Sequence, residues 1–134
     1  MNDALRWVVA LAVLGHGIGH VLFMPFLFGA MRLDATGQSW LLTPALGDGL
    51  VRAVASIAAG AALVAFVLAA GGIALQSPWW RPVAIAGAAA SIGLVVAMWG
   101  GLQPSSAIWA LAFDAAVLVA LLLVRWPGPE LIGS

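Results

Sequence analysis

Four long apolar segments, separated by short polar connections, constrain this chain more than any other feature. A helix needs roughly 20 apolar residues to cross a bilayer core of about 30 Å. The qualifying segments are residues 5–28, 50–75, 83–102 and 105–124. We therefore predict an all-α fold: one domain over residues 1–134 that forms an integral membrane four-helix bundle in contact with the lipid bilayer.

The composition supports this prediction. Of the 134 residues, 64% are hydrophobic and 7% are charged, whereas soluble domains carry about 25% charged residues. The formal net charge is zero, so the chain lacks the basic surface that nucleic acid requires, and we expect no nucleic-acid partner. The sequence contains no cysteine, which excludes disulfides, iron–sulfur clusters and thiolate zinc sites.

Charge placement predicts the orientation of the bundle. The first segment is longer than a signal-peptide core of about 7–15 residues, so we expect it to be retained as a span. Short connections make consecutive helices antiparallel, and an even number of spans puts both termini on one side. The positive-inside rule then favours cytoplasmic termini in a bacterial inner membrane. The termini side carries Arg6, Arg81 and Arg125, and the other side carries Arg32 and Arg52.

Tryptophans lie near the ends of the segments, where an apolar ring with one N–H donor suits a membrane interface. We expect Trp79, Trp80 and Trp126 to anchor one interface, with Trp7 nearby. Residues 40–42 lie within a polar connection and are predicted to form a short segment at the level of the headgroups.

Proline and glycine predict local features of the helices. Pro25 removes a backbone donor inside the first segment and predicts a kink there. Pro104, followed by two serines, predicts a helix start with a serine cap. Gly15 and Gly19 are four residues apart, and we expect them to form a notch for close packing within the bundle, or for a homodimer.

Three ionisable side chains fall inside the apolar segments: His16, His20 and Asp114. Such groups are costly against lipid, so they face the bundle interior and mark candidate functional sites. Residues four apart share one helix face, and centring the spans puts His16 and Asp114 near the bilayer midplane. We therefore predict that the three face one another, with Ser91 of the third segment as a further ligand-binding candidate.

Two histidines and a carboxylate can hold a divalent metal ion, and the set suits zinc or iron. Metalloprotease chemistry is excluded because no glutamate lies between His16 and His20. A structural hydrogen bond, a small polar ligand, proton or cation movement and haem ligation stay open. The two histidines share one face, so they cannot be the opposite axial ligands of one haem.

Three motifs carry a resemblance to known proteins: His16-Gly17-Ile18-Gly19-His20, Trp79-Trp80 and Phe113-Asp114-Ala115. In these the chain resembles a group of small bacterial four-helix membrane proteins with a His-Gly-x-x-His-like first helix. The resemblance covers nearly the whole chain and implies a fold but no reaction. In size and helix count the chain is also similar to DoxX-like proteins, which are linked to quinone-related redox complexes, although it lacks the charged residues expected along DoxX helices.

Three functions are consistent with these observations. The first is a bundle that binds a metal or small polar ligand at His16, His20 and Asp114. The second is a structural or accessory subunit of a larger membrane complex. The third is a proton-coupled small transporter, which fits least well because four-helix multidrug exporters use a glutamate in the first helix, and the one glutamate here is Glu130.

Overall fold

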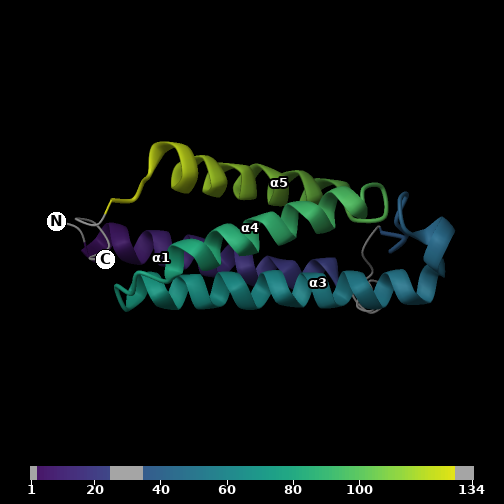
Figure 1. The fold of residues 1–134 in the computed structure, drawn as a ribbon, viewed down its shortest axis with the longest axis horizontal. Coiled ribbons are helices and arrows are strands. Elements are labelled where there is room, and N and C mark those ends of the chain that lie inside the picture. The colour runs from purple at the N-terminus through teal and green to yellow at the C-terminus, as the bar shows by residue number, and fades with distance from the viewer. Residues whose placement is uncertain (1–2, 25–34, 129–134) are drawn as a thin grey trace.

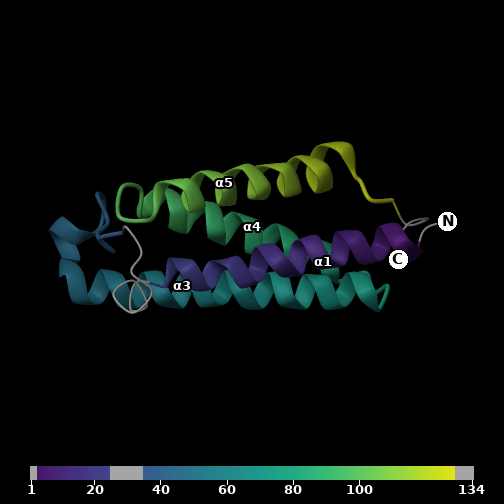
Figure 2. The same cartoon turned by 180° about the vertical axis from the view of Figure 1, so that it is seen from behind.

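A computed structural model of the chain describes residues 3–24 and 35–128, and these residues form an all-helical fold (Figures 1 and 2). Four helical stretches are long and apolar enough to cross a membrane. The elements in chain order are α1 (Asp3–Gly19), the 3-10 turn η1 (His20–Phe23), α3 (Thr43–Ala74), α4 (Trp80–Ala97), α5 (Pro104–Leu118) and the π-helical turn η3 (Val119–Val124).

The four long helices pack in sequence, each against the next, and α1 and α5 do not form a closely packed pair. α1 packs against α3, α3 against α4, and α4 against α5, whereas α1 and α5 do not pack closely along their lengths. Figure 1 shows α5 along one side of the molecule and α3 along the other, with α1 and α4 between them. Figure 2 shows α1 and α5 facing each other on the opposite side of the bundle.

Two apolar cores lie one after the other along the bundle. The core nearer the start of α1 includes Phe66, Ile73 and Trp80, and the second core includes Phe23 and Met98. α3 and α4 contribute buried residues to both cores, while the first and fourth spans contribute to one core through α1 and η3 and to the other through η1 and α5. The positions between those residues form a separate layer. That layer contains the polar side chains predicted from the sequence.

The boundaries of the helices differ from the predicted ones. α3 begins at Thr43 rather than near residue 50, because Gly47 adopts a non-helical conformation with φ 75° that joins a short first helix to the long one. α4 begins at Trp80 and ends at Ala97, which is earlier at both ends than predicted. The fourth span ends at Val124 as predicted, although its last turn is π-helical.

The first span, predicted as one helix to residue 28, changes from α-helix to 3-10 helix within the residues that the structure describes. Its helix tightens into η1 at His20, and the carbonyl of Val21 accepts a hydrogen bond from the Met24 N–H at 3.2 Å. The kink predicted at Pro25 lies outside the described residues.

The serine cap predicted for α5 is wrong, and one of the tryptophans predicted for the membrane interface is buried within the bundle. The N-cap of α5 is Gln103 without a side-chain cap, and Ser106 instead donates to the Gln103 side chain at 2.8 Å. Trp80 is 2% exposed and packs its Cβ next to Gly72, so it belongs to the core rather than to the outer surface. Gly72 allows this close contact between α3 and α4, because an added Cβ there would lie 2.7 Å from the Trp80 Cβ.

The segment before α3 is hydrogen-bonded to the C-terminal end of α4. The Trp40 indole donates to the carbonyl of Val96 at 2.8 Å, and the Ser39 hydroxyl donates to the carbonyl of Ala97. These carbonyls belong to the last turn of α4, where helices leave acceptors without intrahelical partners. The segment predicted for the headgroup level is therefore fixed to α4 while the Trp40 ring stays exposed.

Candidate metal centre

The predicted cluster occupies the layer between the two apolar cores. His16 comes from α1, His20 from the first position of η1, and Asp114 from α5, while Ser91 reaches the layer from α4. His20, Ser91 and Asp114 are at most 1% exposed. The proximity expected from helix periodicity and span centring is therefore observed.

His16 and Asp114 form a direct pair across the space between α1 and α5. His16 Nε2 donates to Asp114 Oδ1 at 2.8 Å, with side chains 10% and 0% exposed. The second carboxylate oxygen, Oδ2, is buried and has no hydrogen-bond partner among the described residues. A buried carboxylate oxygen without a partner is energetically unfavourable and marks a place for a cation or a donor.

The hydrogen bonds of His20 define its tautomer. Its Nδ1 lies 3.1 Å from the backbone carbonyl of His16, which can only accept, so Nδ1 carries a proton. In the neutral ring Nε2 is then the acceptor, and Ser91 donates its hydroxyl to it at 2.7 Å. A histidine that donates through one nitrogen to a backbone carbonyl presents the other nitrogen as a metal ligand in many metalloproteins.

Aromatic rings surround the two imidazoles. Phe113 stacks on His16 with ring centroids 4.1 Å apart and an interplanar angle of 15°. Phe66 packs edge-on against His16 at 4.7 Å and lies 5.5 Å from His20, and Phe23 packs against His20 at 5.7 Å. These rings fix the imidazole orientations and keep the site apolar apart from its own polar atoms.

The three ionisable residues have the geometry of a metal-ligand set. One ligand atom from each of His16, His20 and Asp114 can be chosen so that all lie within 4.8 Å of one another. Two imidazole nitrogens and a carboxylate oxygen are typical ligands of zinc and non-haem iron. The arrangement could also serve as a hydrogen-bonded structural pair, because His16 and Asp114 already satisfy each other in part.

The three glycines in and next to the histidine motif do not all pack against neighbouring helices. Gly17 faces α3, where an added Cβ would lie 2.7 Å from the Phe66 Cβ, so this residue allows the close helix contact. Gly15 and Gly19 have no heavy atom within 4 Å of an added Cβ. The predicted packing notch at Gly15 and Gly19 is therefore not used within the bundle.

Sequence reasoning missed Phe66 and Phe23 as neighbours of the histidines. Phe66 is the one aromatic residue between positions 50 and 75, a stretch that otherwise consists of small and aliphatic residues apart from Arg52. That isolation was a usable signal, because a single large ring among alanines must fill a space that a neighbouring helix leaves open.

Comparison of the chain with protein-family models, curated proteins and solved structures finds no match, and the resemblance inferred from the motifs stays a prediction.

Proposed function

We propose that this chain is a bacterial inner-membrane protein that binds one divalent metal ion, zinc or iron, through His16, His20 and Asp114. The observation that carries the proposal is the convergence of the three ligand atoms within 4.8 Å between two apolar cores. Three protein ligands leave at least one coordination position open, which is typical of metal sites that bind or convert a further molecule.

The outer surface supports the membrane setting. Large apolar side chains point away from the bundle on several helices, among them Ile57 at 73% exposure and Leu123 at 76%. Apolar surface on this scale is unfavourable in water and favourable against lipid tails. With the termini in the cytoplasm, the connection between α1 and α3 would face the periplasm.

The electrostatics of Asp114 favour a cation at the site. Its carboxylate is fully buried, and ionised groups in an apolar interior need a nearby opposite charge. Arg6 and Arg81 lie in the first turns of α1 and α4, and Arg125 directly follows η3. The remaining described arginine, Arg52, lies within α3 and donates to the carbonyl of Thr36 at 2.8 Å. A proton on His16 or a metal ion is therefore the available counter-charge, and a metal ion could also engage the unpartnered Oδ2.

Small side-chain movements would be enough to form the site. Metal–ligand bonds of about 2.0–2.2 Å in a tetrahedral site put neighbouring ligand atoms about 3.3 Å apart. His16 Nε2 would release to solvent the proton that it donates to Asp114, and this 2.8 Å pair would open slightly. His20 would exchange its Ser91 hydrogen bond for the metal. The Ser91 hydroxyl would then lie beside the ion as a hydrogen-bonding or ligand oxygen.

Metal analysis of detergent-purified protein tests the proposal. The protein is purified with a histidine-free affinity tag, exposed to zinc or iron(II), and desalted before elemental analysis. We expect one ion per chain, and loss of that ion in His16→Ala, His20→Ala and Asp114→Asn. Asp48→Asn is the matched control, because it removes an exposed carboxylate outside the cluster, and it should keep the metal.

A structural role is the second candidate, and the 2.8 Å His16–Asp114 hydrogen bond favours it. In that case the chain would act as an accessory subunit of a larger membrane complex, with the cluster holding α1 and α5 in register. Wild-type protein that takes up neither metal, and that co-purifies with partner subunits, would replace the metal proposal with this one.

A further inference from the structure

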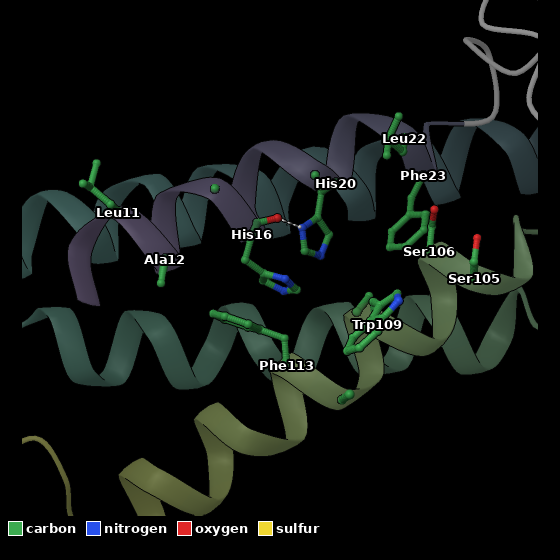
Figure 3. A pocket seen from close by; sticks show the side chains of 14 residues that line it. Leu11, Ala12, His16, His20, Leu22, Phe23, Ser105, Ser106, Trp109 and Phe113 are labelled. Carbon is green, nitrogen blue, oxygen red and sulfur yellow. Dashed lines mark hydrogen bonds between the residues drawn. The ribbon is translucent and has the colours of Figure 1, made fainter. Parts of the chain in front are cut away.

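A groove runs between α1 and α5 on the side where these helices do not pack together. Figure 3 shows Leu11 and His16 of α1 and His20 of η1 facing Trp109 and Phe113 of α5. The groove encloses about 830 Å³, a volume within the range of about 300–1,000 Å³ found for small-molecule sites. It reaches the cluster at His16, whose ring forms part of its wall.

Glycine on α1 keeps the groove open. Gly15 and Gly19 line it, and an added Cβ at either position would meet no atom within 4 Å. Gly17, on the opposite face, is in tight contact with α3. The first helix therefore uses one glycine to pack and two glycines to leave a surface uncovered.

The polarity of the groove changes along its length. Near the start of α5 it is lined by Ser105, Ser106 and the exposed Trp109, which offer hydroxyl and indole N–H groups. At the far end, toward the start of α1, the lining is Leu11 and Ala12. None of the described residues that line it is an arginine, aspartate or glutamate, so the described part of its polar end offers hydrogen bonds without a fixed charge.

The length of the groove matches one lipid chain. Along α1 and η1 it extends from Leu11 to Phe23, which is about 18–20 Å at the rise of these helices. One leaflet of the hydrocarbon core is about 15 Å thick.

We propose that the α1–α5 groove binds a single-chain membrane amphiphile with an uncharged, hydroxyl-bearing head, such as a monoacylglycerol. The head lies at Ser105, Ser106 and Trp109, near the membrane surface. The chain follows Gly19 and Gly15 toward the apolar end and passes the edge of His16. This inference goes beyond the metal proposal and does not depend on it.

Photolabelling in vesicles of uncharged phospholipid tests the inference. The probe is a monoacylglycerol with a diazirine in the middle of its chain, and adducts are mapped by mass spectrometry. We expect adducts on groove residues of α1 and α5, loss of these adducts with excess unlabelled monoacylglycerol, and their persistence after metal is removed with a chelator. Adducts spread equally over outward residues such as Ile57 of α3 would overturn the proposal.

Filling the groove provides the matched comparison. Gly15→Leu combined with Gly19→Leu should abolish the adducts. Gly93→Leu, at an exposed glycine of α4 with equally open surroundings, should leave them unchanged. Leucine favours helix over glycine, so both variants should keep the helical circular dichroism of the wild type. Undiminished labelling of the filled groove would contradict the proposal.

Two further arms distinguish other occupants. A long-chain fatty acid or a lysophospholipid at the same concentration should compete less well than monoacylglycerol, and stronger competition by either would refute the uncharged head. The chain contains no cysteine, so Gly15→Cys introduces a single thiol. Efficient disulfide-linked dimers of this variant would show that a second copy covers the groove, which would also overturn the proposal.

Discussion

The His16–Asp114 pair gives the sharpest prediction about stability. Asp114 is buried, and its Oδ2 already lacks a hydrogen-bond partner among the described residues. His16→Ala removes the hydrogen bond to Oδ1 as well, and it removes the ring that stacks on Phe113. A buried polar group without a partner costs about 1–3 kcal/mol, and an aromatic contact contributes about 0.5–1.5 kcal/mol. We therefore expect His16→Ala to lower the free energy of unfolding by about 3 kcal/mol.

The double variant isolates the pairwise contribution. Interhelical hydrogen bonds in membrane bundles reach about 1.7 kcal/mol in double-mutant cycles, and complete burial of Asp114 places this pair near that limit. Once His16 is absent, Asp114→Ala should remove the stranded carboxylate, so the double variant should be no less stable than His16→Ala alone. The expected coupling energy is about 1.5 kcal/mol.

Reversible unfolding in mixed detergent micelles, with a chelator present, measures these energies. Asp48→Ala serves as the control for removal of an exposed carboxylate, which should change stability by less than about 0.5 kcal/mol. Additive effects of His16→Ala and Asp114→Ala, with coupling below about 0.5 kcal/mol, would refute the inference that the two side chains support each other.

Three further predictions concern packing, the second histidine and orientation. Gly17→Ala should destabilise the protein by about 1–3 kcal/mol because its Cβ would overlap Phe66, whereas Gly15→Ala should be neutral or stabilising, and equal effects in thermal unfolding would contradict this contrast. Ser91→Val should cost about 1–3 kcal/mol in the metal-free protein, because His20 Nε2 loses its donor; unchanged unfolding in the presence of a chelator would count against the assigned tautomer. A reporter fused to the C-terminus should be active only if it functions in the cytoplasm, and activity of a periplasm-dependent reporter would reverse the proposed topology.

Much of the fold could be predicted because the determining signals are local. The lengths of the apolar segments define the four helices, and the fourfold spacing of His16 and His20 puts both on one face. Span centring placed Asp114 at the depth of His16, since two spans of similar length share one bilayer. The cluster was therefore accessible from spacing and depth alone.

The remaining features depend on packing that the sequence does not reveal. The early start of α3 depends on Gly47 adopting a positive φ, and many glycines in this chain do not. Trp80 is buried, with its Cβ against Gly72 of α3, and no local pattern specifies such a contact between two helices. The sequence likewise predicts packing at Gly15 and Gly19, whereas Gly17 is the glycine of α1 that packs closely against α3.

X-ray absorption spectroscopy of zinc-loaded protein tests the central claim most directly. The proposal predicts a first shell with two imidazole nitrogens at about 2.0–2.1 Å and carboxylate oxygen at about 2.0–2.2 Å, with the outer-shell scattering of two histidine rings. His20→Ala should remove the scattering of one ring. A first shell of oxygen atoms without imidazole scattering would contradict a metal centre at His16, His20 and Asp114.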